Sequence, residues 1–387
     1  MITALALLAC SAVGLTMDDL VKAVDSKRLR ASVEHLASFH TRNTLSPGNA
    51  ESAAWVASEL KNIPGVEVEV MSYLIAKGRR VPEDTTAVQV VAKIPGADDR
   101  VILIGAHLDS LNLSVDAKTG RAPGANDDAS GVAAVMELVR ILSTRKWQHT
   151  LIFVAFSGEE QGLLGSRALA RRAKADGWKL DAVLSNDTVG SSKNKSGQSD
   201  SKRVRVFSDE GTSENPHNSR ELARYVEWIV RHKMKDFGIK LVLRKDRFGR
   251  GGDHTPFAEE GYSAIRFIEV HEEFTRQHTP DDLPEHMDWA YLAKVAGANL
   301  VAMATLAEAG EAPTNVRIKL DQNHDTTVTW KAVAGQKYVV YWRDTASAEW
   351  QGSKEVGAVG EATIKGINKD DHFFAVGAEN GIPVAVR

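Results

Sequence analysis

The sequence has a single cysteine, Cys10, among its 387 residues. Disulfide bonds within the chain are therefore excluded, and a metal site would have to use histidine and carboxylate ligands instead of thiolates. The chain also lacks an excess of charge, because 48 Lys and Arg stand against 51 Asp and Glu, for a formal net charge of -3. This balance gives no electrostatic reason to expect binding to nucleic acid or to an acidic membrane surface.

Long hydrophobic runs are missing except at the N-terminus. Elsewhere no apolar run approaches the roughly 18 residues that a membrane-spanning helix needs, so no membrane span is predicted. The stretch from about Ile2 to Leu15 is apolar and ends in small residues, which predicts a signal peptide over residues 1–15, cleaved after about Gly14, and a secreted or periplasmic protein. Two alternatives remain, because no Lys or Arg precedes this stretch: a lipid anchor at Cys10, which ends the sequence LLAC, or the start of a buried helix.

Helical and strand patterns alternate through most of the chain. Amphipathic spacing predicts helices at the beginning and at the end of the segment 16–310. It also predicts a helix over residues 129–147. Between them lie short apolar segments, such as VILIGAH, TLIFVAF, DAVLSND and SAIRFIEV, that are typical of strands buried on both faces. This alternation predicts a three-layer α/β/α sandwich with a mixed, largely parallel sheet.

The pattern changes after Gly310. Residues 311–387 show short alternating strands separated by turns and no helical pattern. We predict a small all-β sandwich that resembles a fibronectin type III module, with Trp330 in its core. Its expected role is either to bind a cell surface or polysaccharide, or to stabilise and space the larger domain.

Metal-binding residue types follow the predicted strands at the points where they end. In an open α/β sheet, ligand sites lie at the carboxyl ends of the strands. A lone His or Asp at such a place is usually structural, but here several strand ends carry one. Clustered carboxylates ionise together only when cations compensate them, and two zinc ions would do so. The residues after the strands are His107, Asp109, Glu159, Glu160, Asp187, His271 and His278, and the loop before the helix at residue 129 adds Asp127 and Asp128.

Five motifs follow one another along the chain: AHLDS, GANDDASG, FSGEEQGLLGS, SNDTVG and QHTPDD. Five motifs in this order are far more specific than a single short motif, and they point to one family. The chain carries the motifs of that family. It resembles the zinc-dependent exopeptidase family that includes bacterial leucyl aminopeptidases and aminopeptidase S, and that shares its fold with glutamate carboxypeptidase and the transferrin receptor. The likeness covers roughly residues 25–309 and includes the segments HTRNTLS and GGDHTPF. In the second segment, Gly252 stands where the resemblance leads us to expect Ser.

The resemblance implies a site with two Zn²⁺ ions per chain. Asp127 would bridge the two ions, and Glu159 would be the general base. Asp109 would orient the His107 ring through its other nitrogen. The remaining ligands would be His107 and Asp187 on one ion, and Glu160 and His278 on the other.

The substrate implied by the resemblance is a peptide with a free N-terminus, from which an aminopeptidase removes residues. His254 and Arg250 are weaker candidates for substrate binding, since a helix start and a solvated basic loop would explain them as well. The sequence leaves three other functions open: a carboxypeptidase or dipeptidase in which Lys245, Arg247 and Arg250 bind the substrate carboxylate, a glutaminyl cyclase with one zinc, and a binding protein without catalysis.

Overall fold

The computed structural model describes residues 16–78, 80–114, 116, 118–209, 218–245, 251–321 and 324–386. The predicted signal peptide with Cys10 lies outside the described residues. So do Arg247 and Arg250, the two arginines that we considered for substrate binding.

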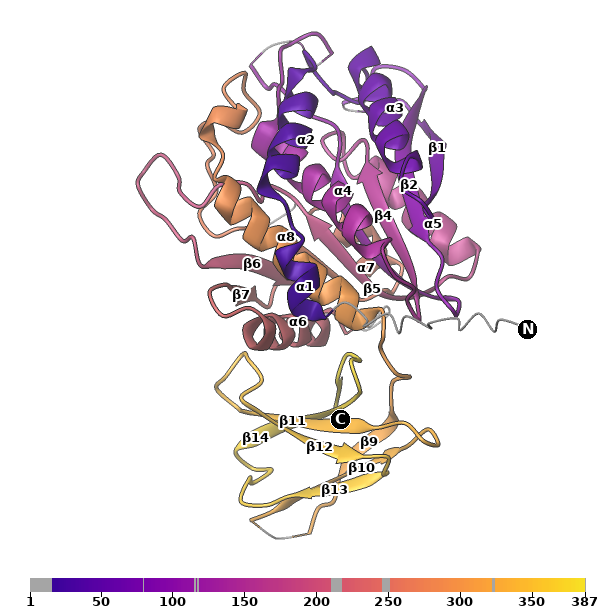
Figure 1. Ribbon diagram of the computed structural model, residues 1–387, viewed down its shortest axis with the longest axis vertical. Coiled ribbons are helices and arrows are strands. Elements are labelled where there is room, and N and C mark those ends of the chain that lie inside the picture. Colours follow the sequence, from indigo (N-terminus) through magenta and orange to yellow (C-terminus); the bar gives the residue numbers. More distant parts are fainter. Residues whose placement is uncertain are drawn as a thin grey trace, which may run out of the picture.

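An eight-stranded sheet with helices on both faces forms the larger part of the molecule (Figure 1). Its strand order is β1-β2-β4-β3-β5-β8-β6-β7, and β3, β4, β5 and β8 run parallel at its centre. The sheet is mixed, because β2 is antiparallel to β4 and β6 is antiparallel to β8. The strands are β1 (Glu67–Ile75), β2 (Thr85–Ile94), β3 (Arg100–His107), β4 (Thr150–Phe156), β5 (Lys179–Asn186), β6 (Arg203–Ser208), β7 (Gly238–Val242) and β8 (Ala264–Glu269).

Two hydrophobic cores lie on the two faces of this sheet. The larger core contains residues of α1, α2, α3, α4, α6 and α8, and the smaller core contains residues of α5 and α7. This arrangement confirms the predicted three-layer α/β fold. The helices are α1 (Met17–Lys22), α2 (Ser26–Ser38), α3 (Pro47–Lys61), α4 (Ser130–Leu142), α5 (Leu164–Ala175), α6 (Ser219–Lys233), α7 (His254–Glu259) and α8 (Trp289–Leu306), with short helical turns η1 (Ala125–Ala129) and η2 (Pro284–His286).

Helix α8 corrects the expectation that no long apolar segment follows the N-terminus. Among the described residues, it alone is long and apolar enough to cross a membrane by length and composition. However, 78% of its apolar window is buried inside the protein. It packs against α2, α4 and α6, so its apolar character is that of a core helix.

The C-terminal part consists of two small antiparallel sheets, of three and four strands. Trp330 is buried in the core between them, as predicted. The three-stranded sheet has the order β13-β10-β9 and the four-stranded sheet the order β12-β11-β14-β15. Their strands are β9 (Thr314–Ile318), β10 (Thr326–Lys331), β11 (Tyr338–Asp344), β12 (Gly352–Gly357), β13 (Glu361–Ile364), β14 (His372–Ala378) and β15 (Val384–Ala385).

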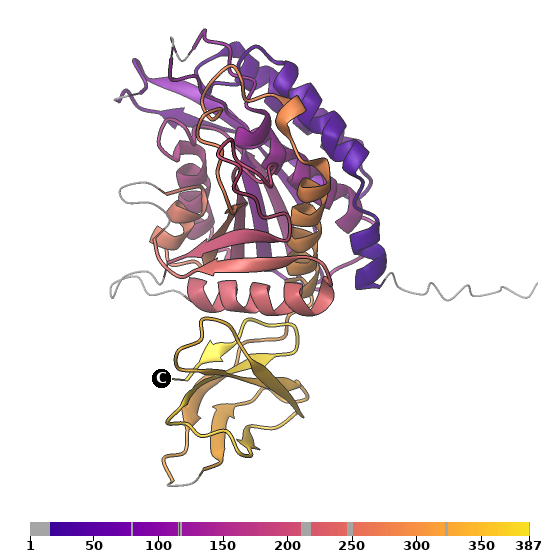
Figure 2. The ribbon, with the colours of Figure 1, turned by 90° about the vertical axis from the view of Figure 1, so that its left-hand side faces the viewer.

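Helix α6 lies between the eight-stranded sheet and the C-terminal sheets (Figures 1 and 2). The ring of Tyr341 on β11 packs edge-on against Tyr225 and Trp228 of α6, with centroids 6.3 and 5.7 Å away. Arg231 Nη2 of α6 donates to the carbonyl oxygen of Trp350 at 2.7 Å. The outer face of the four-stranded sheet is therefore covered by the larger domain.

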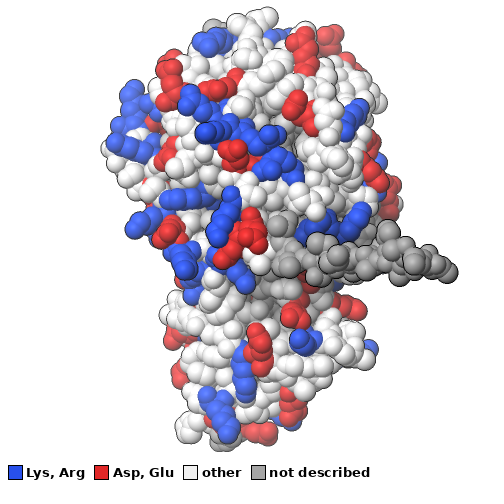
Figure 3. Space-filling view, in the orientation of Figure 1, with Lys and Arg blue, Asp and Glu red and all other residues white. Residues whose placement is uncertain are grey.

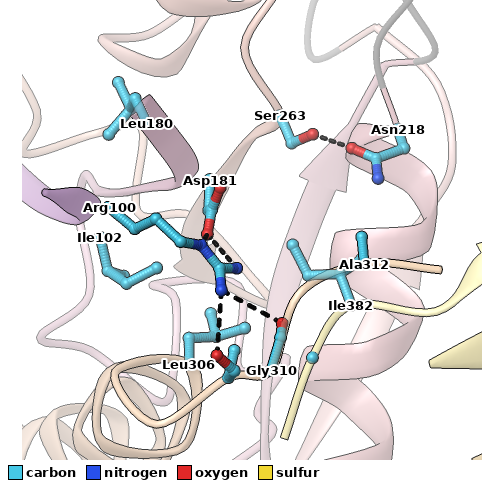
Figure 4. A pocket seen from close by; sticks show the side chains of 12 residues that line it. Arg100, Ile102, Leu180, Asp181, Asn218, Ser263, Leu306, Gly310, Ala312 and Ile382 are labelled. Carbon is cyan, nitrogen blue, oxygen red and sulfur yellow. Dashed lines mark hydrogen bonds and ion pairs between the residues drawn. The ribbon is translucent and has the colours of Figure 1, made fainter. Parts of the chain in front are cut away.

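A cavity of about 240 Å³ lies at this junction, at the starting ends of β3 and β5 (Figure 4). Arg100 in its wall donates to Asp181 and to the carbonyl oxygens of Ala309 and Gly310, which fixes the chain where it enters the C-terminal part. Because Arg100 begins β3 and His107 ends it, this cavity is at the opposite end of the sheet from the predicted site.

Candidate metal centre

Five predicted metal ligands meet at the carboxyl ends of the central strands. They reach this edge from separate segments because parallel strands all end on the same side of a sheet. His107 is the last residue of β3, Asp187 directly follows β5, and Asp127 lies in η1 before α4. Glu160 follows β4, and His278 lies in the loop after β8.

The ligand atoms form two groups that share Asp127. In the first group, His107 Nε2 lies 3.1 Å from Asp127 Oδ1 and 3.7 Å from Asp187 Oδ1. In the second group, His278 Nε2 lies 3.1 Å from Asp127 Oδ2 and 3.0 Å from Glu160 Oε1. Asp127 thus turns one carboxylate oxygen toward each histidine.

These separations fit zinc. Two ligand atoms that each lie about 2.1 Å from a tetrahedral zinc ion are about 3.4 Å apart. The distances within the two groups, 3.0 to 3.7 Å, scatter around that value. The donor set of two imidazoles and three carboxylates also suits zinc.

In the protein without bound metal, the buried carboxylates and histidines of the site stabilise each other's charged forms. Burial opposes ionisation of Asp127, but His107 and His278 outweigh it and hold its pKa well below the usual range. Burial likewise opposes a charge on His278, yet Asp127 and Glu160 raise its pKa to about 11. Without metal, the protonated imidazoles therefore supply the positive charge that compensates the carboxylates. With metal bound, the metal would supply it.

Glu159 stands apart from both ligand groups. It is partly buried, whereas its neighbour Glu160 is buried and faces His278. Burial, together with the charges of Glu160 and Asp187, raises the pKa of Glu159 well above its usual range, although His107 opposes the shift. A carboxylate with a raised pKa is suited to accept and return a proton near neutral pH.

Asp109 contacts the site differently from our prediction. His107 Nδ1 lies 3.0 Å from the backbone carbonyl oxygen of Asp109, and 3.8 Å from its carboxylate. The carboxylate instead accepts hydrogen bonds from the backbone N–H groups of Glu159 and Glu160, at 3.2 and 3.1 Å. The backbone of Asp109 thus orients the ring, and its side chain positions the two glutamates.

Asp128 connects three segments of the site from behind. Its carboxylate accepts hydrogen bonds from the backbone N–H groups of His107, Gly131 and Thr188, at 3.2, 3.0 and 3.0 Å. These bonds link the end of β3, the start of α4 and the residue after Asp187. Asp128 is fully buried and belongs to neither ligand group, so its role in this geometry is to hold the backbone.

Sequence reasoning missed the role of Asp282. Its two carboxylate oxygens accept hydrogen bonds from the backbone N–H groups of Asn126 and Asp127, each at 2.9 Å. Asp282 therefore fixes the backbone of the residue that the two ligand groups share. The available signal was its place in the motif QHTPDD, to which we assigned only His278.

Arg42 was also missed, although it lies in the quoted segment HTRNTLS. Its guanidinium is fully buried and donates to the carbonyl oxygens of Leu36, Leu108, Pro123 and Gly124. It thereby ties the loop after His107 to the segment that precedes Asp127. A third missed residue, Arg266, contacts Asp187, and its signal was a charge inside the otherwise apolar strand SAIRFIEV.

Of the two candidate substrate residues, the structure describes one. His254 is buried at the start of α7 and is not part of either group. Arg250 lies outside the described residues.

Comparisons with known proteins agree with this architecture. The chain is 35% identical over 398 residues to a protein of Leptosphaeria maculans named "Probable zinc metalloprotease", with 92% of each chain covered. It is 36% identical over 400 residues to a protein of that name from Pyricularia oryzae, covering 91% of this chain and 80% of the relative.

Two solved structures share the fold. The LapA aminopeptidase of Legionella pneumophila matches with a TM-score of 0.60 at 21% identity, over 76% of this chain and 75% of LapA. The glutaminyl cyclase of Fimbriiglobus ruber matches with a TM-score of 0.57 at 16% identity, over 73% of this chain and 95% of the cyclase. Residues 89–303, which contain all five ligand positions, match the model of Peptidase family M28. The chain therefore belongs to peptidase family M28.

Proposed function

We propose that the protein is a zinc-dependent aminopeptidase with two Zn²⁺ ions per chain. His107, Asp127 and Asp187 would hold one ion, and Asp127, Glu160 and His278 the other. The observation that carries this assignment is the shared Asp127, whose two oxygens each face a different histidine at 3.1 Å. A carboxylate in that position fits a bridge between two metals.

The reaction would be hydrolysis of a peptide bond. When bound, the zinc ions supply positive charge that polarises the scissile carbonyl and acidifies water. Glu159 would accept a proton from the attacking water and deliver it to the leaving amine. Asp109 supports this role because its carboxylate fixes the backbone of Glu159. Asp128 and Asp282 would keep the ligands in place while the charges change.

The finer proposal, removal of N-terminal residues, rests on the family resemblance and on the aminopeptidase LapA among the structures with this fold. Two rivals have specific support. The glutaminyl cyclase among these structures makes cyclase activity the first alternative. A carboxypeptidase or dipeptidase would need a cation for the substrate carboxylate, and Arg80, which donates to the carbonyl oxygen of Glu160, lies beside the site.

Blocked peptides separate these functions. We expect cleavage of peptides with a free N-terminus and an amidated C-terminus, and none of the same peptides after N-acetylation. Cleavage of the acetylated peptides together with resistance of the amidated ones would show a carboxypeptidase. Conversion of an N-terminal glutamine without peptide cleavage, at one zinc per chain, would show a cyclase.

We also propose that residues 1–15 direct export and that the mature chain has a peptidase domain over residues 16–310. Mass spectrometry of the protein expressed with its own N-terminus tests this. A mature chain that begins after about Gly14 supports a signal peptide. A lipid on Cys10 would instead support an anchored protein, and an intact N-terminus would contradict export by either route.

For residues 311–387 we propose a fibronectin type III-like domain that stabilises the peptidase. The packing of Tyr341 on α6 supports this role over that of a freely presented binding module. Pull-down of the full chain on insoluble polysaccharides and on cell walls tests the alternative: retention that is lost when the domain is removed would favour surface binding.

A further inference from the structure

Arg266 is a fully buried arginine in the middle of β8, between Ile265 and Phe267. Burying a guanidinium costs free energy unless an anion compensates it. Its Nη2 lies 2.7 Å from Oδ2 of Asp187, one of the proposed zinc ligands. A permanent cation is thus built in directly behind the metal centre, because arginine stays charged at any physiological pH.

The contact divides the carboxylate of Asp187 between two partners. Oδ2 faces Arg266 at 2.7 Å, and Oδ1 faces the metal position that Asp187 shares with His107. Burial opposes ionisation of Asp187, but Arg266 and His107 outweigh it and lower its pKa to about 2. Asp187 is therefore an anion whose charge is already partly compensated before any metal binds.

The other metal position differs in this respect. The carboxylates of Asp127 and Glu160 face His278, which binds a metal as a neutral ring. Arg80 donates to the backbone carbonyl oxygen of Glu160 and not to its carboxylate. Among the described residues, Asp187 is therefore the one proposed ligand whose carboxylate contacts an arginine side chain.

Gly252 makes room for this arrangement. A Cβ at residue 252 would lie 2.9 Å from Cδ of Arg266, closer than real Cβ atoms come to a neighbour, and 3.2 Å from Nε. The absence of a side chain at residue 252, where the family resemblance leads us to expect Ser, is thus physically coupled to the arginine. The two positions form one feature of this chain.

We propose that Arg266 is a positioning residue that makes the two metal positions unequal. It restricts Asp187 to one oxygen for the metal and adds fixed positive charge there, so zinc is held less tightly by His107 and Asp187 than by Glu160 and His278. Buried charges are poorly screened, and like charges repel. The inference rests on the proposed two-metal centre.

Titration of the metal-free full-length protein with Zn²⁺ alone, followed by calorimetry, tests this proposal. The wild type is expected to bind two zinc ions in a tight and a weaker step. In Arg266→Met, which removes the charge and leaves an apolar side chain shorter than arginine, the weaker step should tighten by about 10-fold or more, on the scale of other residues that support metal ligands. Arg266→Lys keeps the charge and should keep the weak step.

The opposite result has a clear meaning. If Arg266 only orients Asp187, Arg266→Met will weaken zinc binding or leave both steps unchanged, and either result overturns the proposal. A wild type that saturates at one zinc would overturn the two-metal centre as well, so the two failures are distinguishable. Thermal melting of each metal-free variant checks the fold, and Arg266→Leu, a smaller uncharged side chain, replaces Arg266→Met if that variant unfolds.

Discussion

Glu159 and Glu160 are adjacent in the chain, but their carboxylates have different surroundings. Glu160 is buried and lies 3.0 Å from His278, while Glu159 is partly exposed and belongs to neither ligand group. The carboxylate of Asp109 accepts hydrogen bonds from the backbone N–H groups of both glutamates and so fixes their positions. One peptide bond thus separates a ligand position from a position suited to proton transfer.

We predict that Glu159→Gln lowers kcat by at least about 100-fold, because an amide cannot accept the proton of water. Zinc content, measured by atomic emission on the dialysed protein, should stay at the wild-type value. The matched control is Glu160→Gln, which should lose zinc. Loss of zinc in the Glu159 variant and retention in the Glu160 variant would show that the two roles are reversed.

From the raised pKa of His278, we predict that zinc binding releases protons. Without metal, burial opposes the charge on His278, but Asp127 and Glu160 raise its pKa to about 11, so the ring is protonated at neutral pH. Since zinc binds the neutral ring, affinity should rise with pH over the range below that pKa, with about one proton released per histidine. Calorimetry in buffers with different heats of ionisation measures this release. Binding heats that do not depend on the buffer would contradict it.

The elements present the ligands, and the loops between them set the geometry. The central strands end together, which brings His107 and Asp187 to one edge of the sheet. The backbone of η1 is held by Asp282 from the loop after His278, so the shared ligand Asp127 depends on a residue 155 positions away in the chain. Hydrogen bonds between loops, such as this one, fix the ligands of the site relative to one another.

Asp282→Asn should weaken zinc binding by about 10-fold to 100-fold, the usual range for groups that support metal ligands. The physical reason is that an amide offers one acceptor where the carboxylate accepts the N–H groups of both Asn126 and Asp127. Competition with a zinc chelator measures the change. The neighbouring Asp281 is exposed, and Asp281→Asn is therefore the matched control. Equal affinities for both variants would refute the role of Asp282.

At the scale of the whole molecule, the C-terminal sheets and α6 share one hydrophobic core. Tyr341, Trp350 and Ala375 belong to the same buried cluster as Tyr225 of α6. Charged groups of both signs are interspersed over the face in Figure 3, and the formal net charge is -3. The contact between the two parts at α6 therefore combines this shared apolar cluster with polar bonds such as that from Arg231 to the carbonyl oxygen of Trp350.

We predict that Tyr341→Ala lowers the free energy of unfolding by about 3 kcal/mol, as expected for removal of a buried aromatic ring. Because the ring belongs to a shared core, the peptidase domain should melt at a lower temperature in calorimetry. Phe373→Ala on the neighbouring β14 is the control, since that ring is 49% exposed and should cost less than about 1 kcal/mol. An unchanged melting transition of the peptidase domain in Tyr341→Ala would show that the two parts are energetically independent.

Much of the fold could be predicted because the local pattern was clear. Apolar segments such as β4, which is buried along its whole length, read as central strands of a parallel sheet. The edge strand β7 was not recognised, because a strand of five residues with one buried side chain, Ile239, gives little pattern. Helix α8 was underrated as a long apolar segment, because Lys294 and Asn299 interrupt its apolar residues.

The sequence by itself determined the residue types available to a metal centre, the order of the segments that carry them, and the change from α/β to all-β structure after Gly310. Those are local properties of composition and periodicity. The tertiary structure alone decided that the carboxylate of Asp109 serves the two glutamates, that Asp282 holds Asp127, and that Arg266 pairs with Asp187. These contacts join residues far apart in the chain, and no local pattern encodes which buried charge will meet which partner.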